Sequence, residues 1–126
     1  MVAIRKPLRS EKELEAYQLS MELVVRVQGL AARLPGEERY ELASQMRRAS
    51  RSILANIAEG FAKRESTKEF KHYMRTAMGS ANEMKTHLQI AARIGYVAEP
   101  EFSELVDGYD HVGRQLNRLI ANWRRF

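Results

Sequence analysis

The sequence contains no cysteine, only three prolines and no long apolar run. Without cysteine the chain can form neither a disulfide framework nor a cysteine-ligated metal site, and it suits a reducing compartment. No segment approaches the roughly 18 apolar residues that a membrane span requires, and the basic N-terminus has no apolar stretch typical of a secretory signal. These absences predict a cytoplasmic protein without a membrane role.

The length and charge of the chain set the next limits. A chain of 126 residues can bury a core without covalent staples and is expected to form one domain. Residues 1–9 are basic, contain Pro7 and show no periodicity, so we predict a flexible basic arm followed by a single domain over residues 10–126. A net charge of +5 permits binding to nucleic acid or to another anionic surface.

Apolar residues recur every three or four positions in four segments, and strand-like alternation is absent from the sequence. This spacing predicts helices at about residues 11–34, 38–63, 67–94 and 100–124. Short connections between helices of this length predict an all-α, antiparallel up-down-up-down four-helix bundle with left-handed crossings near +20°.

Sequence signals at the helix ends agree with these boundaries. Pro35-Gly36 ends the first helix, and Gly95 ends the third. Ser10 with Glu13 fits a capping box at the start of the first helix, in which each side chain bonds a free backbone N–H. The same box is predicted for Ser66 with Glu69 at the third helix, and Pro100 opens the fourth.

Each predicted helix has a set of core positions. In the first helix the apolar stripe is broad, which indicates two packed neighbours. The predicted core positions are Leu14, Tyr17, Met21, Val24, Gln28 and Ala31, widened by Leu23, Val27 and Leu30; Leu42, Met46, Ala49, Ile53 and Ile57; Phe70, Met74, Ala77, Ala81, Met84, Leu88 and Ala91; and Phe102, Leu105, Tyr109, Val112, Leu116, Leu119 and Trp123.

Residues able to carry chemistry are few and scattered. Glu83 and His87 lie four residues apart, but a bundle metal site needs a second such pair on a facing helix, so we interpret them as an intrahelical carboxylate–imidazole contact. No serine has an evident base, and a phosphate-cradling glycine loop is missing. Gly79 and Gly113 stand alone within helices, and we interpret both as points of close helix contact. We therefore predict no catalytic residue, metal or cofactor.

Small and polar residues lie beside the core positions of the second and third helices. Glu83 could accept hydrogen bonds from Arg48 or Asn56, because these side chains lie on the neighbouring helix. Buried polar groups need such partners, since an unpaired one costs about 1–3 kcal/mol. We predict a structural polar network that fixes helix register, formed by Arg48, Ser52, Asn56, Glu59, Ser80 and Glu83.

Basic residues gather in three places: on the second helix, at the turn after it, and on the fourth helix, where no acidic residue follows Asp110. Arginine suits phosphate because its planar fork can bond two oxygens at once. The alternative is a solvated face paired with nearby acids such as Glu65 and Glu69. The candidate nucleic-acid contacts are Arg47, Arg51, Lys63, Arg64, Lys68, Arg114, Arg118 and Arg125.

The broad apolar stripes of the first and fourth helices permit a subunit interface as well. A bundle that exposes a second apolar face commonly buries it on a partner. Tyr109, Trp123 and Phe126, near one end of the fourth helix, are the predicted contacts.

The chain resembles the four-helix-bundle proteins encoded in intervening sequences of bacterial 23S ribosomal RNA genes. The resemblance extends from about Leu14 to Trp123, with Met84 as a local departure where the family often has leucine. The residues that carry it are Pro35, Glu37, Glu38, Tyr40, Leu42, Gln45, Arg47, Arg48, Ala49, Ser52, Ile53, Asn56, Ile57, Ala58, Glu59 and Gly60, followed by Gly79, Ser80, Glu83, Thr86 and Leu88.

This resemblance implies further properties that the residues alone do not. A relative with the same fold, the accessory variability protein of diversity-generating retroelements, forms a basic pentameric barrel that binds nucleic acid and a reverse transcriptase. The resemblance therefore implies a homopentamer, and it suggests RNA or DNA and a reverse transcriptase as possible partners.

Three function classes follow from the sequence. The leading hypothesis is a non-enzymatic homo-oligomeric bundle that binds nucleic acid, with structured RNA as the expected ligand, through phosphate contacts. The alternative is a protein-interaction or scaffold module with no nucleic-acid role. An enzyme is disfavoured, because the sequence holds no convincing catalytic constellation.

Overall fold

The computed structural model describes residues 8–123, and this part of the chain folds into four long helices without any strand. Two single-turn 3-10 helices, Glu11–Glu13 and Gly36–Glu38, precede the first and second long helices. The predicted all-helical class is confirmed, whereas most of the predicted arm, at residues 1–7, lies outside the described range. The long helices are α1 (Glu15–Arg33), α2 (Leu42–Ala62), α3 (Thr67–Ile94) and α4 (Glu101–Asn122).

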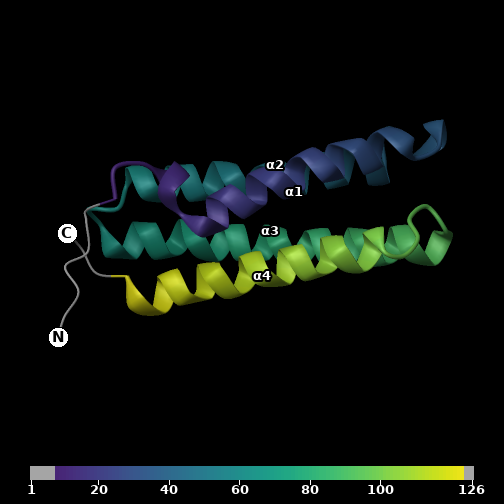
Figure 1. Ribbon diagram of the computed structural model, residues 1–126. Coiled ribbons are helices and arrows are strands. Elements are labelled where there is room, and N and C mark those ends of the chain that lie inside the picture. Colours follow the sequence, from purple (N-terminus) through teal and green to yellow (C-terminus); the bar gives the residue numbers. More distant parts are fainter. Residues whose placement is uncertain (1–7, 124–126) are drawn as a thin grey trace.

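The helices pack as a four-membered bundle. α2 packs most extensively on α3, and α4 closes the arrangement by contacting both α3 and α1. Within residues 8–123 the diagonal pairs, α1 with α3 and α2 with α4, have no close backbone contact. Figure 1 shows that consecutive helices are joined at alternating ends of the bundle. The core therefore lies in the space that all four helices enclose.

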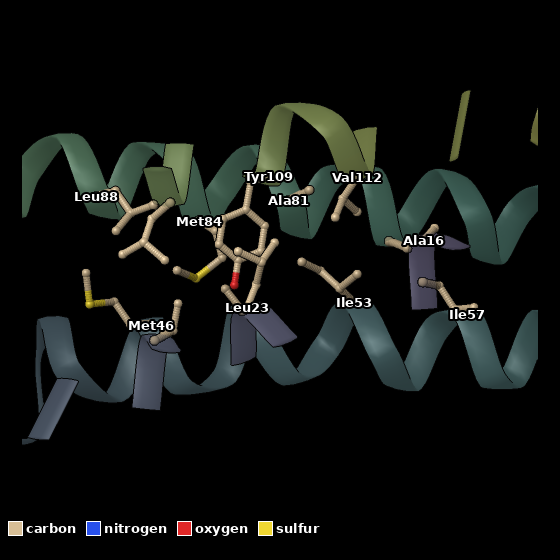
Figure 2. Close-up of a cluster of buried hydrophobic side chains, with 14 of the residues drawn as sticks. Ala16, Leu23, Met46, Ile53, Ile57, Ala81, Met84, Leu88, Tyr109 and Val112 are labelled. Carbon is tan, nitrogen blue, oxygen red and sulfur yellow. The ribbon is translucent and has the colours of Figure 1, made fainter. Parts of the chain in front are cut away.

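The core positions predicted for α2 and α3 are all buried, so the heptad spacing located both helices correctly. In α4, Phe102 and Leu119 at the two ends of the stripe are half-buried, and the others are buried. Figure 2 shows Tyr109 of α4 reaching across the bundle between Met84 of α3 and Leu23 of α1. The widest side chain of the core thus connects three helices.

The predicted core positions of α1 were partly wrong. Leu23, Val27 and Leu30 are buried, but Met21 is 43% exposed and Gln28 is exposed as well. The buried side of α1 instead includes Ala16 and Ser20, which the predicted stripe left out. A broad apolar stripe does not by itself define which of its edges faces inward.

α1 and α2 both begin later in the sequence than predicted. Ser10 accepts a hydrogen bond from the backbone of Lys12 at 3.2 Å, so it caps a 3-10 turn, and α1 begins only at Glu15 after extended Leu14. α2 begins at Leu42, because the chain around the predicted start at about residue 38 forms the 3-10 helix Gly36–Glu38.

The ends of α3 agree with prediction. Ser66 accepts the backbone N–H of Glu69 at 3.2 Å, which is the first half of the predicted capping box. Gly95 has a φ of 96°, the left-handed geometry that favours glycine after a helix. Pro100 occupies the N-cap position immediately before α4.

Close helix contact occurs at glycines other than those predicted. A Cβ on Gly79 or Gly113 would meet nothing within 4 Å, so the interpretation of both as points of close contact was wrong within the described bundle. A Cβ on Gly60 would lie 2.8 Å from Tyr73 Cβ, and one on Gly108 would lie 2.6 Å from a methyl of Leu23. These two glycines let α2 approach α3 and α4 approach α1.

Candidate nucleic-acid interface

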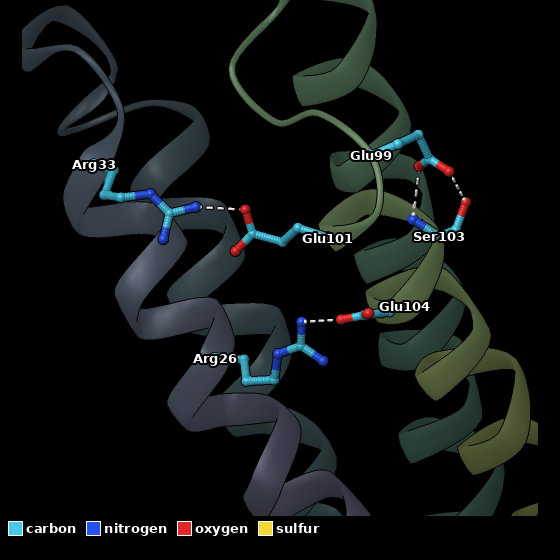
Figure 3. A network of polar contacts seen from close by, with 6 residues as sticks. All are labelled: Arg26, Arg33, Glu99, Glu101, Ser103 and Glu104. Carbon is cyan, nitrogen blue, oxygen red and sulfur yellow. Dashed lines mark hydrogen bonds and ion pairs between the residues drawn. The ribbon is translucent and has the colours of Figure 1, made fainter.

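The first half of α4 holds its acidic residues, and it uses two of them to hold α1. Glu101 accepts a hydrogen bond from Arg33 at 2.5 Å, and Glu104 accepts one from Arg26 at 2.8 Å (Figure 3). The hydrogen bond to Glu101 raises the pKa of the Arg33 guanidinium, which stays charged. The acidic first half of α4 therefore forms ion pairs with α1.

Every charged residue in the second half of α4 is basic. Arg114 and Arg118 lie four residues apart and so share one side of the helix, where both are exposed. Neither forms an ion pair with any residue in the range 8–123. Arg125, the third predicted contact of this helix, lies outside the described residues. Among the described residues, the two arginines therefore have no carboxylate partner, and they present their guanidinium groups to solvent.

The basic residues at the turn between α2 and α3 are largely engaged within the protein. Lys63 donates to the hydroxyl of Tyr73 at 3.1 Å and lies 3.6 Å from Glu59. The hydrogen bond to Tyr73 is the main reason why the pKa of Lys63 is raised. Arg64 donates to the carbonyl of Phe61 at 3.0 Å and stacks over its ring.

A shallow hollow of about 750 Å³ lies beside this turn. Two cations and two carboxylates line it together, so its net charge is close to zero, and it does not attract a phosphate as a purely basic hollow would. Lys68 is exposed outside it and forms no ion pair within the described part of the chain. The lining residues are Leu8, Ala62, Lys63, Arg64, Glu65, Ser66, Glu69 and Trp123.

The arginines of α2 lie in the first half of that helix, away from the turn between α2 and α3. Arg51 is exposed and donates to Gln28 of α1 at 3.2 Å, whereas Arg47 is half-buried. Arg48 is also exposed, three residues before Arg51 and so close to it on the surface of α2. These residues form a second basic area, separate from that of α4.

Three residues of the predicted polar network lie together. Ser52 and Ser80 share a hydrogen bond of 3.0 Å across α2 and α3, and Asn56 donates to Ser52 Oγ at 3.1 Å. All three are half-buried.

The other three residues of that network are exposed and do not join it. Glu83 contacts His87 at 2.9 Å, as the sequence predicted for this pair. The proposed hydrogen bonds from Arg48 or Asn56 to Glu83 do not form among the described residues, because the histidine one turn away is the nearer partner. Glu59 pairs with Lys63.

The predicted subunit contacts on α4 were misplaced. Tyr109 is 1% exposed and Trp123 is 6% exposed, with its ring stacked on Phe70 at 3.8 Å. Both therefore belong to the core and cannot form an external interface, while Phe126 lies outside the described residues. Sequence reasoning missed the large apolar side chains that do face solvent, namely Val25, Tyr40, Ile90 and Ile94.

Over residues 8–123 no group of three or more histidine or acidic side chains is arranged to hold a metal ion. Burial raises the pKa of the Tyr109 hydroxyl, which makes that group a poorer acid and leaves it inside the core. None of the described helices is both long and apolar enough to cross a membrane.

Comparison with known proteins places this geometry in a family. A crystal structure of a protein with unknown function from the S23 ribosomal protein family of Bacteroides thetaiotaomicron matches the fold with a TM-score of 0.77. The match is 24% identical in sequence and covers 85% of this chain and 96% of that one. A comparison with curated proteins gave no match. The family model for 23S rRNA-intervening sequence proteins matches residues 12–118, and the chain therefore belongs to this family.

Proposed function

We propose that the protein is a non-enzymatic, homo-oligomeric four-helix bundle that binds structured RNA through phosphate contacts. The observation that carries this proposal is the second half of α4, where Arg114 and Arg118 are exposed on one side of the helix without a carboxylate partner among the described residues. Guanidinium groups that are free of internal ion pairs can bind phosphate oxygens bidentately.

The expected contacts are to the backbone of the RNA and not to its bases. Double-stranded RNA is recognised mainly through shape and phosphate contacts, which exposed arginines on a rigid helix can supply. Lys68 in the first turn of α3 adds a further exposed cation, and a net charge of +5 favours association. DNA is an alternative ligand with the same phosphate chemistry.

A fluorescence anisotropy titration of labelled hairpin RNA tests this proposal. Affinity should fall linearly with the logarithm of salt concentration, because each neutralised phosphate releases counterions. Arg114→Glu and Arg118→Glu should each weaken binding and lower the salt slope by about one.

Arg93→Glu is the matched control, because Arg93 is exposed near the far end of α3 and undergoes the same change of charge. It should leave most of the affinity intact. Absence of binding at low salt, or an equal loss from the Arg93→Glu control, would contradict the α4 site.

A specific observation favours a second candidate function, a protein-interaction or scaffold module. Five large apolar side chains are exposed within the described residues, and apolar surface of this kind commonly marks a protein contact. A scaffold would bind its partner with little dependence on salt. A reverse transcriptase is one such partner, and it is implied by the family resemblance alone.

The proposed assembly and location have separate support. We infer a homopentamer, whose subunit count comes from the family resemblance, while the exposed apolar residues support self-association as such. The absence of cysteine is compatible with a cytoplasmic location.

We also propose the detailed topology, an antiparallel up-down-up-down bundle with left-handed crossings. Its support is the heptad spacing of α3 and α4 together with the connections at alternating ends in Figure 1. The hydrogen bonds among Ser52, Asn56 and Ser80 would fix the register of α2 against α3.

A further inference from the structure

Two stripes of exposed residues border α2, one on each of its neighbours. On α1, Met21, Val25 and Gln28 recur at intervals of four and three residues, and Gln28 accepts the hydrogen bond from Arg51 of α2. We call the residues Met21, Val25, Gln28 and Ala32 the α1 stripe. All four are exposed, and none is charged.

The second stripe lies on α3. Glu83, Ile90 and Ile94 are exposed and follow one another at helical spacing, and Ser80, three residues before Glu83, bonds Ser52 of α2. We call the residues Thr76, Gly79, Glu83, Ile90 and Ile94 the α3 stripe. It extends from Thr76 to Ile94 with half-buried His87 between Glu83 and Ile90, and its five residues are exposed to solvent.

Gly79 in the α3 stripe has no explanation within one bundle. Glycine in the middle of a helix is less stable than alanine, and here a Cβ would meet nothing within 4 Å among the described residues. Gly60 and Gly108, in contrast, each allow another helix to come close. If a side chain of another molecule packs onto α3 at Gly79, this glycine permits a close approach, as Gly60 and Gly108 do within the bundle.

The two stripes match in height along the bundle. The Ser52–Ser80 and Arg51–Gln28 contacts relate the three helices, and Figure 1 shows α1 and α3 running in the same direction. With a rise of about 1.5 Å per residue, Val25 lies within about one residue of the height of Gly79.

Charge and apolar surface match at the same heights. Counted from the Ser52–Ser80 contact, Arg51 lies about two residues, or about 3 Å, from the height of Glu83. Tyr40, 82% exposed in the turn before α2, lies at the same end of the bundle as Ile90 and Ile94, which are 42% and 54% exposed, since Tyr96 after α3 donates a hydrogen bond to Glu38 before α2. Arg51 and Tyr40, the two exposed groups considered beside the α1 stripe, therefore each have a complement on the α3 stripe.

We propose that the α1 stripe of one copy, with Arg51 and Tyr40 beside it, packs against the α3 stripe of a second copy. Val25, 68% exposed, packs over Gly79 of the next copy, and Tyr40 covers Ile90 and Ile94 there. Arg51 faces the carboxylate of Glu83, which gives the contact its charge complementarity.

This assignment rests on the proposed homo-oligomer and names the surfaces that build it. The two surfaces differ, so the contact is head-to-tail and not two-fold. A head-to-tail contact builds a ring when its rotation closes and an open filament when it does not, and the matched heights of the two stripes favour a ring because added copies do not climb along the bundle axis. Arg51 then serves subunit contact, which leaves the arginines of α4 as the RNA-binding set.

Sedimentation velocity of the full chain tests the assignment. Wild type should sediment well above the 14.5 kDa monomer. Val25→Glu and Gly79→Gln should each sediment as a monomer with an unchanged helical circular dichroism spectrum, because both positions are exposed. Asn117→Glu, at an exposed position on α4, is the matched control and should behave as wild type.

Mixing the two variants tests the head-to-tail geometry. Val25→Glu keeps an intact α3 stripe, and Gly79→Gln keeps an intact α1 stripe, so an equal mixture should form a dimer and nothing larger. A mixture that stays monomeric would overturn the head-to-tail contact. An oligomeric wild type whose size survives both substitutions would overturn the stripes and leave self-association standing.

Two further readouts separate this assignment from the proposed function. A monomeric wild type would overturn self-association itself, whereas RNA affinity measured on the same sample tests the α4 site independently. If Arg51 faces Glu83, then Arg51→Glu and Glu83→Arg should each weaken the assembly. In an equal mixture both kinds of contact between unlike copies bring opposite charges together, so assembly should recover. Absence of any recovery would overturn the pairing of these two residues.

Discussion

At the scale of single residues, the hydroxyl of Tyr109 stands out because it is buried without a partner among the described residues. Burial raises the pKa of this phenol above its ordinary value of about 10. The folded state keeps Tyr109 neutral. The contribution of this group to the free energy of unfolding is therefore fully present below about pH 10, and it is lost as pH rises toward the folded pKa. Tyr109 therefore contributes to unfolding at alkaline pH.

Replacement of Tyr109 by phenylalanine should remove this dependence. The ring and its packing are retained and only the unpaired hydroxyl is lost, so the free energy of unfolding at neutral pH should stay the same or rise by up to about 1 kcal/mol. Above about pH 10 the variant should lose less stability than wild type, by about 1.4 kcal/mol per pH unit. Urea unfolding at a series of pH values measures both effects.

Met84→Leu is the control for this experiment, because Met84 lies beside the Tyr109 ring in the core and carries no titratable group. Its pH dependence should follow that of wild type. A loss of more than about 1 kcal/mol in Tyr109→Phe at neutral pH would mean that the hydroxyl has a stabilising partner.

At the scale of the helices, the core positions of α2, α3 and α4 were predicted well, because apolar residues spaced three and four apart select one face of each helix. Met46, Met74 and Leu116 are buried as their spacing predicts. α1 was harder to orient, since Met21 and Val25 extend its apolar residues onto the solvent side. The start of α2 could not be predicted either, because an acidic first turn fits a 3-10 helix as well as an α-helix.

The glycines provide a prediction at this scale. Gly60→Ala should destabilise the bundle, because the added Cβ would lie 2.6 Å from Met74 Cε and 2.8 Å from Tyr73 Cβ. Met74 can move at its flexible end, but Tyr73 Cβ is fixed to the backbone of α3, so the two helices must separate slightly. Overpacking of this kind costs about 1–3 kcal/mol, from which a gain of up to about 1 kcal/mol in helix propensity is subtracted.

Gly113→Ala is the matched control on α4, where a Cβ meets nothing within 4 Å of the described atoms. It should raise the free energy of unfolding by up to about 1 kcal/mol. Chemical denaturation of the two variants measures the difference. A stabilised Gly60→Ala would contradict the close approach of α2 to α3.

At the scale of the whole molecule, the sequence indicated a basic protein but could not tell which cations are free. Lys63, on the predicted binding surface, is engaged by Tyr73 and Glu59, whereas Arg114 has no internal ion pair in the described range. Pairing depends on which helices become neighbours, and the order of residues along the chain does not specify this. For the same reason the apolar surface on α1 and α3 could be located only once the helices were placed.

Self-association through that surface has a consequence for stability. A partner subunit binds only the folded bundle, so mass action should raise the melting temperature of wild type as protein concentration increases. Val25→Glu, which blocks the α1 stripe, should melt at a temperature that does not depend on concentration. Scanning calorimetry of both proteins over about a hundredfold range of concentration measures this.

The comparison of the two proteins separates folding from assembly. Val25 is exposed, so its replacement should leave the monomer core intact, and at the lowest concentration both proteins should melt at nearly the same temperature. Their melting temperatures should diverge as concentration rises, because only wild type gains subunit contacts. A wild type with a constant melting temperature would show that the bundle gains no stability from self-association, and the exposed apolar residues would then be left for a different protein partner.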